Sequence, residues 1–180
     1  AYKAKLYEFE DSKTSLLGDY LPQKLGFEKD ENVVFVTVTK DFFGDILSFF
    51  ENGKAARVSL SAFETKTNRR KLVNAYSAAS RLVAMFHITE ECEFICTASN
   101  DRCLIMSTAM VNPKTTKNTA RVAVMTLKKN TLESVVAYRD GLFGDPMHYR
   151  TKNLPAAGCF LRKGDDPFAV PIAEEPAEKE

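Results

Sequence analysis

The stretch FFENGKAARVSLSAFETKT, from Phe49 to Thr67, carries the pattern that decides the fold. An apolar run leads into the dipeptide Asn52-Gly53, which is followed by a segment of alternating apolar and polar residues. An Asn-Gly pair between two such segments is a strong signal for a β-hairpin. Val58 and Leu60 are the apolar members of the alternation, which is typical of a strand with one buried face. The stretch therefore predicts two antiparallel strands joined by a tight turn.

The same pattern returns at an offset of 48 residues, in CTASNDRCLIMSTAMVNPKT. Asn100-Asp101 aligns with Asn52-Gly53, and the basic residue after the turn is Lys54 in the first copy and Arg102 in the second. Repeats of 40 to 50 residues with about four short strands each are typical of propeller-like blades. A helical solenoid would need apolar faces with a period of 3.6 residues, and these runs are too short and too turn-bounded for it. We therefore expect an all-β fold of about three four-stranded blades.

The offset also suggests boundaries along the chain. Repeat units are expected at about 1–63, 64–111 and 112–139, and a loop with an acidic, disordered tail at 140–180. The tail lacks a core-forming pattern and is rich in Pro and Glu, a composition typical of disorder.

The first unit is expected to contain further strands before its hairpin. VVFVTV at 33–38 is β-branched, and its part VFVTV at 34–38 aligns with LVAMF at 82–86, so both are predicted as strands. The N-terminal YKAKLYEF, from Tyr2, resembles the third strand of a unit whose beginning is missing. The chain is therefore expected to be a piece of a longer protein.

Charge is distributed unevenly, although the net charge is only +1. From Thr65 to Lys129 there are eleven Lys and Arg against four Asp and Glu, whereas from Leu161 to Glu180 there are six acids against three bases. A basic body with an acidic tail is a pattern found in nucleic-acid-binding proteins. No apolar run is long enough to span a membrane.

Three basic phrases built on Thr, Lys and Asn recur along the chain: TKTNRRKL from Thr65, KTTKNTAR from Lys114, and the shorter RTKN from Arg150. Lys and Arg side chains bind phosphates, and Asn and Thr add neutral donors. The recurrence suggests one such corner per blade, facing a polyanion; the alternative is that these are solvated loops. Lys54 and Arg102 follow the two turns and either line the same rim or keep a strand edge soluble. The candidate phosphate-binding residues are Lys54, Lys66, Asn68, Arg69, Arg70, Lys71, Arg102, Lys114, Lys117, Asn118 and Arg121.

Catalysis and metal binding are not expected. The sequence contains no P-loop, no G-x-S-x-G and no G-x-G-x-x-G, and its two histidines have no partner signature. The four cysteines form no C-x-x-C pair and are expected to be reduced thiols. Glu90, Glu91 and Glu93 are expected at a solvated turn, and the Phe residues of the strand patterns in the core.

At this point the two units ILSFFENGKAARVSLSAFE and EFICTASNDRCLIMSTAMV resemble the blades of a known domain. It is the C-terminal β-pinwheel of bacterial type IIA topoisomerase A subunits, those of DNA gyrase and topoisomerase IV. The resemblance covers roughly residues 1–139 and depends on the repeat pattern more than on an invariant motif.

The resemblance implies a partial β-pinwheel that binds duplex DNA without sequence preference and bends or steers it along a basic rim, so that the parent enzyme controls DNA topology and supercoiling. No catalytic residue and no cofactor belong to this domain; other domains of the parent use ATP and Mg²⁺. The implied partners are duplex DNA, a second A subunit and the ATPase B subunits, and the implied location is the cytoplasm, at the nucleoid. The fragment itself is expected to be a monomer that contacts no membrane.

Two departures from the family bear on this expectation. The glutamine–arginine–glycine-rich box of the gyrase version is absent, which favours a topoisomerase-IV-like or divergent subunit with weaker wrapping. Only about three blades fit this length, fewer than the family's usual five or six. The alternative function is a propeller-type protein-interaction module: basic residues in one continuous stripe would favour DNA, and scattered ones a protein partner.

Overall fold

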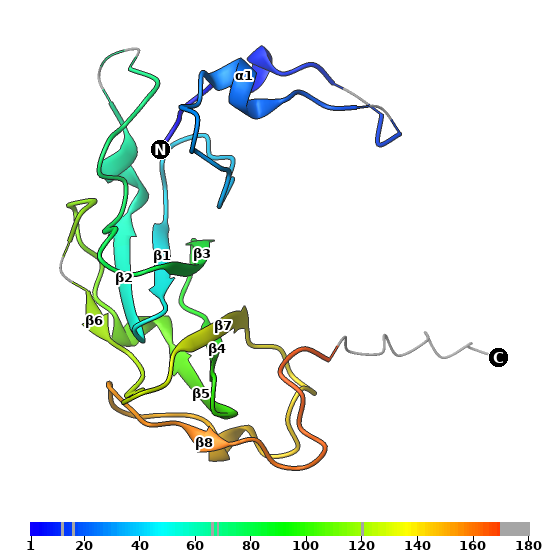
Figure 1. Ribbon diagram of the computed structural model, residues 1–180, viewed down its shortest axis with the longest axis vertical. Helices are drawn as coiled ribbons and strands as arrows, with labels where there is room; N and C mark the ends of the chain where they lie inside the picture. Colours follow the sequence, from blue (N-terminus) through cyan, green and yellow to red (C-terminus); the bar gives the residue numbers. More distant parts are fainter. Residues whose placement is uncertain (12, 16, 66, 68, 120, 170–180) are drawn as a thin grey trace.

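The strands form two four-stranded antiparallel sheets, with little helix (Figure 1). The structure is a computed structural model that describes residues 1–169, except residues 12, 16, 66, 68 and 120. The first sheet, called blade 1, has the order β3-β1-β2-β6, and the second, blade 2, has the order β7-β4-β5-β8. The strands are β1 Asp45–Phe50, β2 Lys54–Ser59, β3 Leu82–Ile88, β4 Glu93–Ala98, β5 Arg102–Ser107, β6 Val122–Ala123, β7 Leu132–Ala137 and β8 Cys159–Phe160. The helices are α1 Leu21–Leu25 and the 3₁₀ turns η1 Leu6–Glu8, η2 Leu60–Phe63, η3 Thr108–Met110 and η4 Pro146–His148.

The two central hairpins repeat each other with the predicted offset. In the β1–β2 hairpin Asp45 pairs with Ser59, and in the β4–β5 hairpin Glu93 pairs with Ser107. Each hairpin ends in a 3₁₀ turn, η2 after β2 and η3 after β5. The all-β prediction and the 48-residue repeat are confirmed.

Each blade is completed by strands that come later in the chain. β3 follows the β1–β2 hairpin in the sequence and pairs with β1 of blade 1. In the same way β7 follows the β4–β5 hairpin and pairs with β4 of blade 2. The segment 112–139, expected as a third unit, supplies β6 to blade 1 and β7 to blade 2. The described residues therefore form two interlocked blades.

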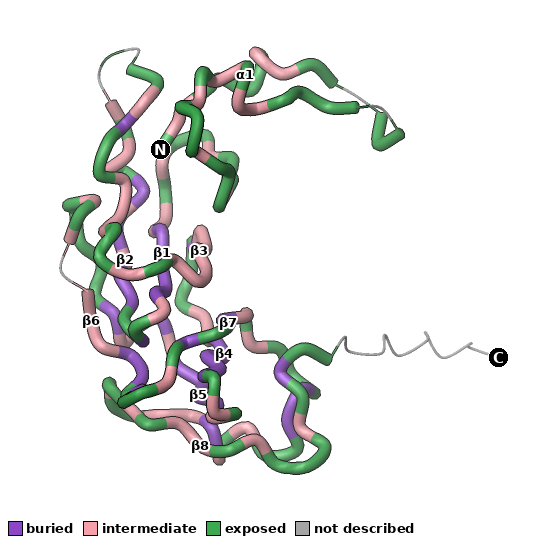
Figure 2. The backbone as a smooth tube through the Cα atoms, in the orientation of Figure 1, coloured by how far each residue is buried: buried purple, intermediate pink, exposed green. Residues whose placement is uncertain are grey.

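The main core lies where the two blades meet. The rings of Phe49 in β1 and Phe94 in β4 lie 5.8 Å apart, and that of Phe86 in β3 lies 4.4 Å from Phe94. Figure 2 shows burial concentrated in the central strands of both blades. The expectation that Phe49, Phe50, Phe63 and Phe94 form the core is confirmed for Phe49, Phe50 and Phe94. Phe63 is only half-buried, because it lies in η2 beyond the end of β2.

The described segment beyond Tyr138 is mostly loop, and it also builds part of blade 2. It contributes β8, and its residues Leu142, Phe143 and Tyr149 pack in a second core cluster with Ile105 of β5. The acidic tail from residue 170 lies outside the described residues.

Two predicted strands are not formed. VVFVTV at 33–38 has no regular structure, and Val34, Val36 and Val38 are exposed by 61 to 67%. In YKAKLYEF, only Tyr2 makes a bridge, and Leu6–Glu8 form the turn η1. The prediction was wrong because a strand needs a hydrogen-bonding partner. The segment aligned with 33–38 is β3, whose partner is the first strand of the preceding hairpin, and the described residues contain no hairpin before β1.

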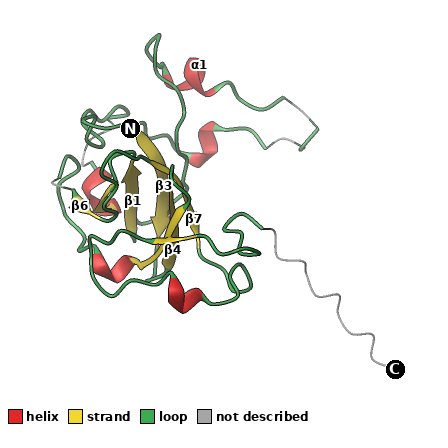
Figure 3. Ribbon diagram, turned by 60° about the horizontal axis from the view of Figure 1, so that its bottom comes forward, coloured by secondary structure: helices red, strands yellow, loops and turns green. Residues whose placement is uncertain are grey.

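Figure 3 shows the outcome: the strands gather in the body of the molecule, while the N-terminal segment is loop and short helix. Within the described part of the chain, no helix has the length and apolar character needed to cross a membrane.

Gly53 in the first hairpin turn provides a test of the packing between the units. Its φ is +73°, and a Cβ built there would lie 2.5 Å from the carbonyl oxygen of Met125. We expect Gly53→Ala to lower the free energy of unfolding by about 2 kcal/mol or more, since strain and a backbone clash add. The measurement is urea unfolding. Gly141→Ala is the matched control, because Gly141 also has a positive φ (+86°) but an added Cβ would meet nothing within 4 Å. Equal losses in the two variants would contradict the packing argument.

Candidate nucleic-acid interface

Four candidate cations lie along the outer side of blade 1. Lys54 begins β2 opposite Ala123 of β6 and is exposed. Lys114 runs parallel to β2: its amide donates to the carbonyl of Arg57 at 2.9 Å, and its carbonyl accepts from the amide of Ser59 at 2.8 Å. These backbone bonds hold the KTTKNTAR phrase against the strand and leave the Lys114 side chain exposed.

Lys117 and Arg121 are held by aromatic rings. The Nζ of Lys117 donates to the carbonyl of Ala62 at 3.2 Å and lies 5.9 Å from the centre of the Phe63 ring. The Arg121 guanidinium lies 4.6 Å from the centre of the Phe50 ring. Cation–π contacts position a cation without neutralising it.

These four residues, called the basic edge, are Lys54, Lys114, Lys117 and Arg121. None of them has an ion-pair partner among the described residues. Asn118 is exposed between the last two. Because Lys117 contacts Ala62 in η2, the structure brings the second basic phrase next to the start of the first.

Two cations of the first phrase, TKTNRRKL, are paired with acidic side chains. Its Lys66 and Asn68 lie outside the described residues, and Arg69 is exposed. Arg70 forms an ion pair with Glu8 at 2.7 Å. Lys71 forms ion pairs with both Glu28 and Glu31. These carboxylate partners were not predicted from the sequence, although the acidic run EKDEN at 28–32 is a visible signal.

Blade 2 repeats part of this arrangement. The RTKN phrase runs parallel to β5 as KTTK runs parallel to β2, with the amide of Thr151 donating to the carbonyl of Ile105 at 3.0 Å. Its Arg150, however, is neutralised by Glu93 of β4 at 2.8 Å. Arg102 stacks on Phe160 of β8, 4.0 Å from the ring centre, and donates to the carbonyl of Gly158. In blade 2 the basic residue that lies beside β5 is therefore neutralised, whereas Lys114, its counterpart beside β2, has no ion-pair partner among the described residues.

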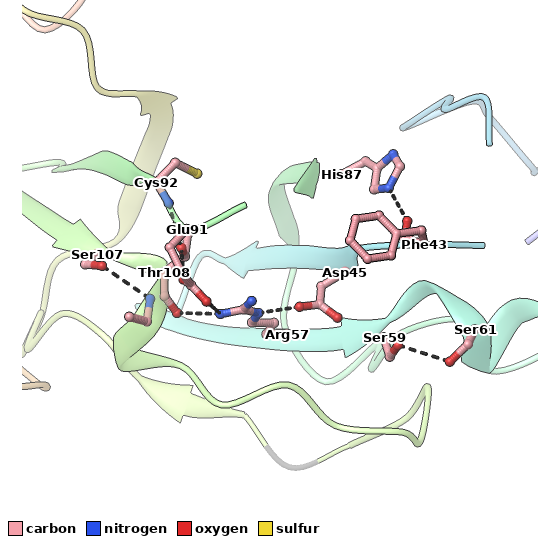
Figure 4. Close-up of polar contacts among 11 residues, drawn as sticks. Phe43, Asp45, Arg57, Ser59, Ser61, His87, Glu91, Cys92, Ser107 and Thr108 are labelled. Atoms are coloured by element: carbon pink, nitrogen blue, oxygen red, sulfur yellow. Dashed lines mark hydrogen bonds and ion pairs between the residues drawn. The ribbon is translucent and has the colours of Figure 1, made fainter. Parts of the chain in front are cut away.

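One further arginine in β2, Arg57, joins the two blades (Figure 4). Its guanidinium contacts Asp45 at 2.6 Å, Glu91 at 2.8 Å and the carbonyl oxygen of Thr108 at 3.0 Å. The Thr108 hydroxyl donates to Glu91 and accepts from the amide of Cys92. Glu90 and Glu91 lie between β3 and β4, as predicted, but Glu91 is also part of this network between the blades. The prediction was wrong for Glu93, which begins β4 and pairs with Arg150.

The network shifts the pKa values of its members. Partial burial acts to lower the pKa of Arg57, but hydrogen bonds to Asp45 and Glu91 outweigh it, and the pKa is raised. The hydrogen bond from Thr108, together with Arg57, holds the pKa of Glu91 below its usual 4.5 against the opposing effect of burial. Both groups are therefore charged near neutral pH, and Arg57 serves to join the blades.

Comparison with solved structures identifies the fold. The chain resembles a crystal structure of the C-terminal domain of DNA topoisomerase IV with a TM-score of 0.64, at 18% identity, over 76% of this chain and 43% of that one. It resembles the DNA gyrase A C-terminal domain with a TM-score of 0.61, at 15% identity, over 87% of this chain and 54% of that one. The chain thus spans about half the length of those domains. No protein-family model and no curated protein sequence matches it. The predicted β-pinwheel fold is confirmed.

The lowered pKa of Glu91 predicts an acid dependence of stability. A carboxylate whose pKa is lower in the folded state than in the unfolded state stabilises the fold at pH values above its unfolded pKa, here 4.5. This contribution is lost as the pH falls through the folded pKa. At pH 7 we expect Glu91→Gln to lower the free energy of unfolding by about 1 kcal/mol, because the pair is partly exposed.

This difference from the unmodified chain should shrink as the pH falls below 4.5, and urea unfolding at a series of pH values measures it. Glu90→Gln is the matched control, since Glu90 has no ion-pair partner in the described part of the chain. A difference that stays constant with pH would exclude the proposed ionic role of Glu91.

Proposed function

We propose that this chain is a C-terminal β-pinwheel domain of a bacterial type IIA topoisomerase A subunit, and that it binds duplex DNA along the basic edge of blade 1. The fold, shared with the topoisomerase IV and gyrase A domains, supports the first statement. The observation that carries the second is the collection of Lys54, Lys114, Lys117 and Arg121 on one side of one sheet, without carboxylate partners among the described residues.

The chemistry of the basic edge suits phosphate rather than base recognition. Lys54 and Lys114 are exposed and end in flexible ammonium groups, which bind phosphates as point charges. Backbone bonds to β2 fix the course of the segment that carries Lys114, so the spacing of the cations is set by the sheet. Such contacts position DNA without reading its sequence. Binding should therefore be indifferent to sequence and should weaken steeply with salt.

In the parent enzyme this domain would bend or steer a DNA segment and so influence how the enzyme changes DNA topology. The pairing with a second A subunit and with ATPase subunits, the use of ATP and Mg²⁺ by other domains, and a cytoplasmic, nucleoid-associated location belong to the same proposal. The short basic edge and the missing glycine-rich box favour binding with limited wrapping, because bending DNA costs several kcal/mol.

A protein-interaction module is the second candidate, and one observation favours it. Val33, Val34, Val36 and Val38 are exposed by 46 to 67%, and Phe43 by 62%. Exposed apolar side chains in an extended segment suit a protein partner that adds a strand to it. The charge on the basic edge is not needed for such a contact, so the two functions can be separated by charge variants.

The test is binding of a labelled duplex of about 40 base pairs, followed by fluorescence anisotropy over a salt series. We expect Lys54→Ala/Lys114→Ala to weaken binding and to reduce the salt slope by about two, since each lost phosphate contact removes about one. Lys13→Ala/Lys163→Ala removes the same charge from exposed positions elsewhere and is the matched control. No binding at low salt, or equal losses in both variants, would overturn the proposed interface.

A further inference from the structure

The N-terminal arm, residues 1–31, lies against the first basic phrase. Its carboxylates contact both described cations at the end of that phrase: Glu8 lies 2.7 Å from Arg70, and Glu28 and Glu31 lie 2.5 and 2.9 Å from Lys71. The two carboxylates bind the Lys71 ammonium group as two phosphate oxygens would. The cations of the basic edge have no such partners among the described residues.

Backbone hydrogen bonds attach the arm at this position. The amide of Lys3 donates to the carbonyl of Arg70 at 2.8 Å, and the amide of Leu72 donates to the carbonyl of Ala1 at 2.8 Å. Tyr2 forms an antiparallel bridge with Lys71. The Ala1 ammonium adds a bond to the Leu72 carbonyl, and the Lys3 ammonium adds one to the Thr65 hydroxyl. None of these bonds involves a strand of blade 1 or blade 2, so release of the arm would leave both blades intact.

The arm is folded so that Glu28 and Glu31 reach Lys71 together. The ring of Tyr2 stacks on that of Phe27, with 4.6 Å between their centres, and the amide of Glu28 donates to the Glu31 carboxylate at 2.8 Å. Hydrogen bonds from Tyr2, from that amide and from Lys71 lower the pKa of Glu31 to about 2. The Glu31 carboxylate is therefore charged at any physiological pH.

The ion pairs are also exposed enough to be exchanged. The side chain of Glu28 is 76% exposed, that of Arg70 57% and that of Lys71 34%. Surface ion pairs contribute little to stability and are screened by salt. Duplex DNA carries about one negative charge per 1.7 Å of its axis, a far higher density than three carboxylates offer.

We propose that the carboxylates of the N-terminal arm are intramolecular competitors for DNA phosphates at Arg70 and Lys71. The arm then withholds Arg70 and Lys71 from DNA until phosphates displace Glu8, Glu28 and Glu31 and extend the contact from the basic edge to these two residues. This inference rests on the proposed function, and it assigns to the arm the regulation of that DNA site.

The test compares two variants that change the net charge equally. Glu28→Gln/Glu31→Gln removes the competing carboxylates, whereas Glu10→Gln/Asp30→Asn removes two exposed arm carboxylates that have no ion-pair partner among the described residues. We expect the first variant to bind the 40-base-pair duplex at least about threefold more tightly than the second at low salt, with a salt slope larger by about one, because Lys71 becomes available. Adding Lys71→Gln to the first variant should abolish this gain.

A second readout is amide hydrogen exchange in the unmodified chain. DNA should speed the exchange of the Lys3 and Leu72 amides, whose bonds attach the arm, and should leave the β1–β2 amides protected. If the chain binds DNA and the two double variants bind equally, the arm is no competitor, although the proposed function stands. If neither the unmodified chain nor Glu28→Gln/Glu31→Gln binds at low salt, the proposed function fails and this inference with it.

Discussion

The pairing of β3 with β1 is the constraint on which the rest of the structure depends. A two-stranded hairpin is marginally stable alone, because it cannot bury both its edges and a hydrophobic face. Here the β1–β2 hairpin is completed on one side by β3, which leads directly into the β4–β5 hairpin of the next blade. The β4–β5 hairpin is completed by β7 in the same way. Each unit is therefore folded only when the following segment of chain is in place.

This interlocking explains where the core and the polar network lie. The rings of Phe49, Phe86 and Phe94 form a mutual cluster, so the strand that links the blades also takes part in the aromatic contact between them. Arg57 adds ion pairs to the contact between the blades, since it contacts Asp45 in its own hairpin and Glu91 in the turn that leads to β4. The Arg57 side chain is only 10% exposed and its guanidinium is paired with carboxylates, so its charge is not available to a ligand.

The same geometry decides which basic residues can meet DNA. The chain lies beside β2 at Lys114 and joins the same edge of blade 1 as β6 from Val122, so the cations carried near these two points collect on one side of that blade. In blade 2 the equivalent return places Arg150 beside Glu93, which neutralises it. Two phrases that look alike in the sequence thus differ in available charge, because a single acidic side chain is present beside one and not the other.

Much of the fold could be predicted from local pattern. The Asn52-Gly53 turn, the alternation at Val58 and Leu60, and the recurrence at 48 residues predicted the hairpins, and the two hairpins have the same register. The strand predicted at 33–38 failed for a physical reason: β-branched residues favour an extended chain, but only a partner strand makes it part of a sheet.

The sequence by itself determined the hairpins, the repeat and the surplus of basic residues, since these depend on residue type and spacing. Only the tertiary structure decided which cations are free, because charge is neutralised across space by residues far apart in the chain. Lys71 and Glu28, 43 positions apart, meet because the arm folds back onto the first basic phrase. Lys54 and Lys114 stay free because β2 and the segment beside it bring no carboxylate to them among the described residues.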